Sequence, residues 1–395
     1  MTTPTMTDPL ASDQTIKLIG DLAEEAGIAH VHMLAWRDLD DVEAGGSELH
    51  AHNVATIWAQ AGLGVTMRTS FAAGRPQRRV RGGYTVIRKA GRYLVFPRSV
   101  ASEITGRLGP SDGLVEIWNG VPFFSPLWVR GPRMVWLHHV HGPMWEMALP
   151  PRLARAGAFL EERIAPPIYR RTPIVTLSES SKAELVTELG FRPKNVTVVP
   201  PGVDPSFSPD GTRDEAPLVV SVGRLVPVKD FARLIDLATR LREEVTDLRL
   251  VVVGEGYEHE ALETQIAHAG AQGWIRLAGR VSDEELVSLY RRAWLVASTS
   301  IREGWGMTIT EAAACGTPCV ATRIAGHTDA VVDGRSGLLA STDDELLDAM
   351  RAIITDPDLR GRLQQGALDR ASELTWEQTA IGTFAVLAAD AARRR

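Results

Sequence analysis

Short apolar runs alternate with longer amphipathic stretches along most of this chain of 395 residues. Apolar runs bounded by Gly, Pro and polar residues are typical of strands in a parallel sheet, and the amphipathic stretches between them are typical of connecting helices. Strands are predicted at 30–34, 65–69, 113–118, 134–137, 173–177, 218–221, 248–253, 275–277, 294–297 and 318–321, and helices at 47–60, 152–169 and 376–392. This alternation predicts an α/β protein with two Rossmann-like halves that face a central cleft.

The clearest break in the pattern is the Pro/Gly/Asp cluster at residues 200–205. Clusters of this composition favour turns and linkers over helices and strands. We therefore predict an N-terminal Rossmann-like domain over 1–204, a C-terminal Rossmann-like domain over 205–375, and a closing helix within 376–395.

The composition is that of a globular protein, with 44% apolar and 23% charged residues. The first 13 residues have neither the basic start nor the apolar centre of a signal peptide. No apolar run reaches the roughly 18 residues that a membrane-spanning helix needs. We therefore expect a cytoplasmic protein that lacks regular structure only in its first dozen residues and at Arg393–Arg395. Cys315 and Cys319 are too few for a disulfide framework or a metal site, and we interpret them as small core residues.

Charge is unevenly distributed, although the net charge is only −6. The stretch 75–107 has a single acid, Glu103, against nine cations: Arg75, Arg78, Arg79, Arg81, Arg88, Lys89, Arg92, Arg98 and Arg107. Such a face suits an anionic lipid surface at the inner side of a membrane or a phosphorylated substrate, and a solvated surface is the simpler interpretation. No nucleic-acid partner is expected. The acidic run 38–43 is interpreted as a solvated loop that closes over a bound substrate.

Two adjacent glycines, Gly45 and Gly46, lie between the first predicted strand and the following helix. Paired glycines let a ligand approach the backbone, and a helix N-terminus offers N–H groups to a phosphate. The spacing differs from the Gly-x-Gly-x-x-Gly of dinucleotide-binding domains, so a nicotinamide cofactor is not favoured. A simple turn is the alternative.

Two cations follow the first strand of the second half, where Gly223-Arg224 and Lys229 separate that strand from a helix. Arg binds phosphate oxygens through paired hydrogen bonds, and Lys acts as a point charge. A departing diphosphate needs cations of this kind if no metal supplies the charge. Two surface cations beside a turn are the alternative.

The most specific motif has two carboxylates, Glu303 in a loop and Glu311 one or two turns into the next helix. Gly304 and Gly306 lie between them and leave N–H groups uncovered at the start of that helix. One carboxylate can bind sugar hydroxyls and the other ribose hydroxyls, while the N–H groups meet phosphate or sugar oxygens. A helix with a favourable N-terminal charge would explain Glu303 alone but not the whole run.

These motifs closely resemble those of the family 4 retaining glycosyltransferases, which have the GT-B fold. The resemblance covers nearly the whole chain, in order: the Gly-Gly loop, a histidine at a strand end, both charged motifs and the closing helix. It implies an acceptor-binding first domain, a nucleotide-sugar-binding second domain, a closing helix that packs back on the first domain, and no metal or other cofactor. Asp230 departs from the family pattern, which has Gly after the Lys. This departure puts the local turn and the donor preference in doubt.

The resemblance also implies roles for single residues. Arg224 and Lys229 would bind the phosphates, Glu303 the transferred sugar and Glu311 the ribose. The other implied donor contacts are Gly45, Gly46, Arg280, Val281, Gly304, Trp305, Gly306 and Met307. Family members commonly have a histidine near the reacting sugar carbon, and His138, which directly follows a strand, fits that place best. The expected catalytic set is therefore His138, Arg224, Lys229 and Glu303.

The run His138-His139-Val140-His141 also allows a metal site, but the sequence offers no convincing further ligand, and a sugar site is preferred. His139, His141 and Trp145 are predicted acceptor contacts. The other aromatic residues of this region are interpreted mainly as core, and an acceptor groove lined by them is the alternative. They are Trp118, Phe123, Phe124, Trp128 and Trp136.

The sequence therefore predicts a retaining transferase that moves a hexose-type sugar from a nucleoside diphosphate to a hydroxyl of a glycan, a lipid-linked acceptor or a small molecule. UDP is the preferred nucleotide and GDP the second. No carboxylate is placed as a covalent nucleophile, so a front-face route is expected, with the diphosphate as proton acceptor. The alternatives are a non-catalytic sugar-nucleotide-binding scaffold and a sugar-nucleotide epimerase of the same fold.

Overall fold

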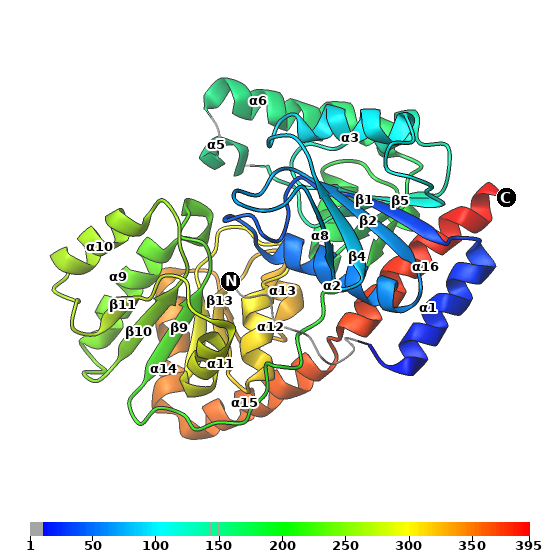
Figure 1. Ribbon diagram of the computed structural model, residues 1–395. Helices are drawn as coiled ribbons and strands as arrows, with labels where there is room; N and C mark the ends of the chain where they lie inside the picture. The colour runs from blue at the N-terminus through cyan, green and yellow to red at the C-terminus, as the bar shows by residue number, and fades with distance from the viewer. Residues whose placement is uncertain (1–10, 143, 149) are drawn as a thin grey trace. The chain divides into compact units, whose positions relative to one another are not determined.

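The computed structural model describes residues 11–142, 144–148 and 150–395, and the chain divides into two compact units (Figure 1). Unit 1 consists of Met1–Gly202 and Thr375–Arg395, and unit 2 of Val203–Leu374. Each unit has a parallel sheet with connecting helices, which confirms the α/β class. The prediction that the first 13 residues are not a signal peptide falls mostly outside the described residues, which begin at residue 11.

Unit 1 contains an eight-stranded sheet in the order β3-β4-β2-β1-β5-β6-β7-β8, parallel except for the β3–β4 pair. The strands are β1 (His30–Leu34), β2 (Gly64–Thr69), β3 (Arg78–Arg81), β4 (Tyr84–Arg88), β5 (Gly113–Trp118), β6 (Arg133–Leu137), β7 (Ile174–Thr176) and β8 (Val196–Val198). From β1 the chain first adds strands on one side and later, from β5, on the other. The β1–β5 border is therefore the switch point, where ligands of open α/β sheets bind beyond the carboxyl ends of the strands.

The helices of unit 1 include a continuous helical segment that changes its pitch. They are α1 (Asp13–Ala26), α2 (Gly46–Gln60), α3 (Val95–Ile104), α4 (Ser125–Trp128), α5 (Met144–Ala148), α6 (Pro151–Phe159), a π-helix (Leu160–Ile164), α7 (Ala165–Tyr169), α8 (Glu179–Thr187) and α16 (Trp376–Arg394). The predicted helix 152–169 corresponds to α6, the π-helix and α7. The prediction that Arg393–Arg395 lacks structure is wrong for Arg393 and Arg394, because α16 extends to Arg394, whose side chain bonds Asp390. Helix α16 packs on α1, α2 and β6 of unit 1.

Unit 2 contains a six-stranded, wholly parallel sheet in the order β11-β10-β9-β12-β13-β14. Its strands are β9 (Leu218–Val222), β10 (Arg249–Val253), β11 (Ile275–Leu277), β12 (Leu295–Ser298), β13 (Cys319–Thr322) and β14 (Gly337–Ala340). Its helices are α9 (Phe231–Arg242), α10 (His259–His268), α11 (Asp283–Arg292), α12 (Met307–Ala314), α13 (His327–Ala330), α14 (Asp343–Thr355) and α15 (Pro357–Ser372).

Alternate residues of the unit 2 strands enter separate cores on the two faces of the sheet. Val219 packs in the core with α9, α10 and α14, and Val220 packs in the core with α11 and α12. Strands buried on both faces read as continuous Val/Leu runs, which is why the sequence revealed them. Here the switch point is the border between β9 and β12, so the loops after these two strands meet at the same edge of the sheet.

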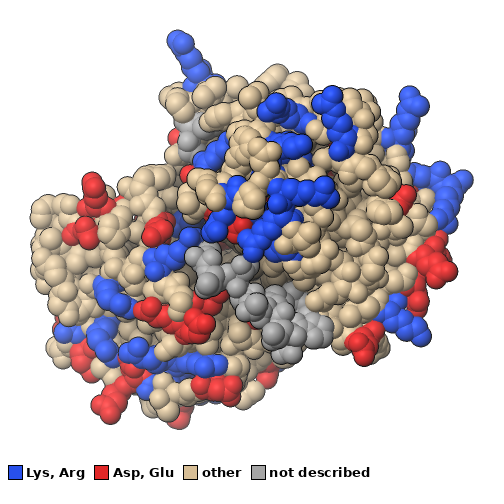
Figure 2. Space-filling model, viewed as in Figure 1, with Lys and Arg blue, Asp and Glu red and all other residues tan. Residues whose placement is uncertain are grey.

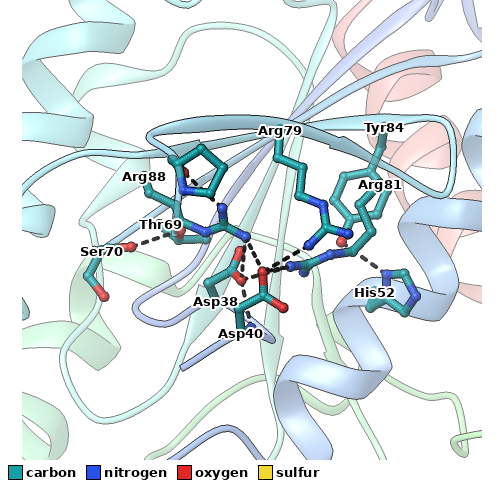
Figure 3. A network of polar contacts seen from close by, with 10 residues as sticks. Asp38, Asp40, His52, Thr69, Ser70, Arg79, Arg81, Tyr84 and Arg88 are labelled. Atoms are coloured by element: carbon teal, nitrogen blue, oxygen red, sulfur yellow. Dashed lines mark hydrogen bonds and ion pairs between the residues drawn. The ribbon is translucent and has the colours of Figure 1, made fainter. Parts of the chain in front are cut away.

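The acidic run 38–43 and part of the basic stretch 75–107 pair with each other, so the prediction of a solvated acidic loop is wrong. Asp38 is 1% exposed, and its Oδ1 lies 2.9 Å from Arg88 Nη2 and 3.1 Å from Arg81 Nη2 (Figure 3). Asp40 contacts the same two arginines. Burial opposes ionisation of Asp38, but the hydrogen bond and charge of Arg88, together with Arg81, lower the pKa of its carboxyl.

These ion pairs hold the loop after β1 against the β3–β4 hairpin and turn two of the nine cations inward. In the view of Figure 2, Lys and Arg side chains gather over unit 1, whereas unit 2 shows both signs interspersed. Membrane contact through residues 75–107 stays a prediction. No helix within the described ranges is long and apolar enough to cross a bilayer.

Candidate functional site

The charged motifs of unit 2 meet at the carboxyl edge of its sheet. The loop after β9 and the loop after β12 are joined by a backbone bond of 2.9 Å from Ile301 N–H to Val228 O, and by an ion pair between Lys229 Nζ and Glu303 Oε1. Thr299 Oγ1 also donates to the carbonyl of Asp230, at 2.8 Å. The structure thus brings Lys229 and Glu303, 74 residues apart in the chain, into direct contact at the switch point.

Glu303 is held as a carboxylate by its neighbours. Its side chain is 17% exposed, and Ser300 Oγ donates to Oε1 at 2.9 Å. Burial opposes ionisation, but the charge of Lys229 and the hydrogen bonds from Lys229 and Ser300 outweigh it and lower the pKa of Glu303. A fixed, ionised carboxylate at the carboxyl edge of a parallel sheet is suited to accept hydrogen bonds from sugar hydroxyls.

Glu311 lies on the second turn of α12 and has a different environment. Tyr290 of α11, which is fully buried, donates its hydroxyl to Glu311 Oε2 at 3.2 Å. Burial, aided by the charges of Asp204 and Asp283, raises the pKa of Glu311 to about 7. Sequence reasoning missed Tyr290, because a lone Tyr on an amphipathic helix gives no signal of a carboxylate partner.

The loop between the two glutamates is supported from within unit 2. Gly306 has a φ of 106° and is the N-cap of α12, so the first N–H groups of that helix follow it directly. The Trp305 side chain is 3% exposed and lies beside Arg370. The predicted contact between Trp305 and the donor is therefore one that only its backbone can make. His327, which sequence reasoning missed, lies beneath the loop: its Nδ1 is 2.9 Å from Thr322 O, and burial lowers its pKa.

The loop that carries Arg224 is fixed by two glycines that sequence reasoning missed. A Cβ on Gly254 would lie 1.8 Å from Gly223 O, and one on Gly256 would lie 2.1 Å from Leu225 O. These contacts require glycine at both positions, since a methyl group cannot displace backbone. In the sequence, two glycines directly after a predicted strand could have indicated this close approach. Arg224 itself is exposed at this edge.

The loop with the predicted donor contacts Arg280 and Val281 lies at the same edge, after β11. Gly254 N–H donates to Gly279 O at 2.8 Å, which ties this loop to the end of β10. Arg280 is exposed, and Val281 packs partly into the core beside α11. Arg224, Lys229, Arg280, Val281, Glu303, Gly304, Gly306, Met307 and Glu311 therefore all belong to the loops and the helix start that follow β9, β11 and β12 of unit 2.

Asp230, the departure from the family pattern, has the backbone conformation that favours glycine. Its φ of 50° and ψ of 48° are left-handed, which Asp tolerates better than most residues. Asp230 is also the N-cap of α9, and its Oδ1 accepts from Arg233 N–H at 3.4 Å. The Asp230 side chain therefore stabilises this turn by capping α9, which glycine, without a side chain, would not do.

Asp230→Ala is expected to reduce the free energy of unfolding by about 1–2 kcal/mol, since it loses the cap and keeps the left-handed strain. Asp230→Gly should cost less, within about 1 kcal/mol of wild type, because glycine removes that strain. Urea unfolding of both variants measures the difference. A Gly variant less stable than the Ala variant would contradict this account of the turn.

In unit 1 the Gly-Gly loop begins α2, with Gly45 as N-cap and Gly46 exposed as the first helical residue. Gly45 N–H donates to Glu48 Oε2 at 2.9 Å, and Arg37 Nε donates to Glu48 Oε1 at 3.3 Å. The loop after β1 is thus fixed on both sides of the glycines, which leaves the exposed backbone of Gly46 at the switch point of the sheet.

His138 is buried, at 5% exposure, and bonds another histidine. Its Nε2 lies 3.0 Å from Nδ1 of His50 on α2. Burial lowers the pKa of His138 to about 3, so its imidazole is neutral near pH 7. The pair links the end of β6 to the helix that begins at Gly46. The predicted contact between His138 and the sugar stays a prediction.

His139, His141 and Trp145 form a stack of rings at the end of β6. The ring centroids of His139 and His141 are 4.9 Å apart, and those of His141 and Trp145 are 5.0 Å apart. Glu161, fully buried on the π-helix, accepts from Trp145 Nε1 at 2.8 Å and from His141 N–H at 3.2 Å. From the sequence, Glu161 is only one acidic residue within a predicted helix. In the structure it lies on a π-helix, a feature often found at functional sites, and bonds two residues of this stack.

The remaining predictions concern metals, cysteines and aromatic residues. Within residues 11–142, 144–148 and 150–395, no group of three or more His, Cys, Asp or Glu side chains is arranged to hold a metal. Both cysteines are buried, and burial raises the pKa of Cys315 to about 11 and of Cys319 to about 12. Trp118, Phe123 and Trp136 are core residues, as expected.

Two family models match consecutive parts of the chain. Residues 44–207 match the model described as Glycosyltransferase Family 4, and residues 204–370 match the model described as Glycosyl transferases group 1. The D-inositol 3-phosphate glycosyltransferases of Kribbella flavida and Stackebrandtia nassauensis are each 37% identical to this chain, over 223 and 254 residues. The alignments cover 51% and 58% of this chain and 53% and 56% of those relatives, so the chain spans about half the length of the curated relatives it matches.

Solved structures match the fold over most of the chain. Sucrose-phosphate synthase from Thermosynechococcus elongatus has a TM-score of 0.76 at 18% identity, over 90% of this chain and 97% of that one. HepE of Anabaena, in complex with UDP and glucose, has a TM-score of 0.70 at 18% identity, over 90% of this chain and 98% of that one. This likeness shows the GT-B fold of two Rossmann-like domains. The two family models together span residues 44–370, so the chain belongs to the glycosyltransferases that these models describe.

Proposed function

We propose that this chain transfers a hexose-type sugar from a nucleoside diphosphate to an acceptor hydroxyl, with retention at the anomeric carbon. The observation that carries the proposal is the contact between Lys229 and Glu303 at the β9–β12 switch point, with the first turn of α12 beside it. A cation, an ionised carboxylate and free helix N–H groups at one edge match the diphosphate and the sugar of such a donor.

The two glutamates are assigned different parts of the donor. Glu303, ionised and fixed by Lys229, accepts hydrogen bonds from the sugar, and Glu311, on α12, accepts them from the ribose hydroxyls. Arg224, Lys229 and the N–H groups of Gly304–Met307 stabilise the charge that develops on the departing diphosphate. The acceptor hydroxyl enters on the side of the leaving group and gives its proton to the diphosphate, so no covalent nucleophile is needed.

The finer assignment of substrates rests on the relatives. UDP is the preferred nucleotide and GDP the second, and HepE, of the same fold, is described in complex with UDP-glucose. The curated relatives are named for D-inositol 3-phosphate, which favours a phosphorylated cyclitol as acceptor among glycans, lipid-linked acceptors and small molecules. The acceptor is assigned to unit 1, with the stacked rings of His139, His141 and Trp145 as its contacts.

A donor screen tests this proposal. Purified protein is mixed with UDP-, GDP-, ADP- and TDP-sugars, and thermal shift and nucleotide release are measured for the wild type, Arg224→Ala and Glu311→Ala. One donor is expected to raise the melting temperature of the wild type and to lose most of that effect in both variants. If no sugar nucleotide binds the folded wild type, the donor site is wrong and a non-catalytic scaffold becomes the better account.

A further inference from the structure

We propose that His50 is a positioning residue for His138, which it holds in a single tautomer with only Nδ1 left for the substrate. The inference rests on the proposed role of His138 at the sugar. No motif pointed to His50, which lies four residues after Gly46 on α2 and has no partner in the sequence pattern.

The geometry of the pair determines which nitrogen of His138 is available. Nε2 of His138 is 3.0 Å from Nδ1 of His50, so one of these two atoms carries the shared proton and both are occupied. The remaining nitrogens of the pair, His138 Nδ1 and His50 Nε2, are both buried without a hydrogen-bond partner among the described residues. A buried polar atom without a partner is costly unless a ligand or water satisfies it. Because His138 is the ring assigned to the sugar, its Nδ1 is the atom that meets a hydroxyl of the bound donor.

His50 is itself held rigidly. It is 1% exposed, with its ring 4.6 Å from that of Trp136 on β6 and 5.9 Å from that of Trp376 on α16. The two histidine rings meet edge to face, at 84°. Burial lowers the pKa of both imidazoles, so the pair is a hydrogen bond between neutral rings. A rigid partner of this kind fixes the orientation of His138, and His138 adopts the tautomer that complements that of His50.

Replacing His50 by Leu and by Asn separates the hydrogen bond from packing, since the two side chains have nearly the same shape. Asn can place an amide atom where Nδ1 of His50 lies, and Leu cannot. We expect His50→Leu to lower kcat for hydrolysis of the bound donor by about 10- to 100-fold with little change in KM, and His50→Asn to recover most of that loss. His52→Leu, two residues on and facing Tyr84 instead, controls for a general effect on α2.

His50→Leu is also introduced into a His138→Ala protein, where it should cost less than about twofold in kcat, because its effect acts through His138. If His138→Ala itself leaves kcat unchanged, the role of His138 in the proposed function is wrong. If His138→Ala lowers kcat but Leu and Asn at position 50 behave alike, the positioning role is wrong.

A second measurement does not depend on turnover. Spectra of protein labelled with ¹⁵N-histidine report which ring nitrogen of His138 carries the proton. One neutral tautomer is expected in the wild type and in His50→Asn, and a mixture in His50→Leu. An unchanged single tautomer in His50→Leu would overturn the inference, whatever the activity.

Discussion

Replacing Lys229 by Met is expected to lower kcat for donor cleavage by about 10²- to 10³-fold, the usual cost of removing one group that stabilises a leaving group. The same change leaves Glu303, whose side chain is 17% exposed, without its counter-charge. The pKa of Glu303 should then rise, and the free energy of unfolding should fall by about 1–3 kcal/mol. Steady-state kinetics and urea unfolding measure the two effects separately.

The double variant Lys229→Met/Glu303→Gln distinguishes catalysis from structure. It replaces the ion pair by two neutral side chains of similar size, so stability should recover most of what Lys229→Met loses. Activity should stay low, because both the cation for the phosphate and the carboxylate for the sugar are gone. A double variant that recovered activity together with stability would show that the pair only supports the fold.

Glu311 is expected to make donor binding depend on pH. A carboxylate accepts hydrogen bonds from both ribose hydroxyls only when ionised, and the pKa of Glu311 is raised to about 7. The dissociation constant of the donor should therefore increase by about tenfold for each pH unit below 7 and level off above it. Titration calorimetry from pH 5.5 to 8.5 tests this. Glu311→Gln should bind weakly at every pH, without the step.

The same residue should lower the stability of the empty protein at high pH. The folded-state pKa of about 7 lies above the ordinary value of 4.5, so the protonated group favours the folded state. Its contribution is complete below about pH 4.5 and is lost as pH rises through 7. Glu311→Gln, which cannot ionise, should therefore be more stable than the wild type at pH 8, by about 1–3 kcal/mol, and close to it at pH 5. Equal stability at pH 8 would contradict the raised pKa.

The sequence determined the parallel sheets and most of the loops that carry the donor residues. Val and Leu fill both faces of the central strands, so β9 and β10 appear as short runs of mostly apolar residues. Because the loops that follow parallel strands lie at one edge, Arg224, Glu303 and Glu311 could be grouped without coordinates. The edge hairpin of β3 and β4 was missed; three of the four residues of β3 are arginines, so the apolar pattern does not indicate a strand there.

Contacts between distant residues were decided by the tertiary structure alone. The pairing of Asp38 and Asp40 with Arg81 and Arg88 joins two runs of opposite charge, each of which looked solvated by itself (Figure 3). The partners of Glu311 and of His138 likewise come from other elements, α11 and α2. The periodicity of apolar residues indicates which face of a helix or strand is buried. It does not indicate which side chain of another element packs against that face. The protonation states of Asp38, Glu311 and His138 depend on those neighbouring side chains, which only the folded chain brings into contact with them.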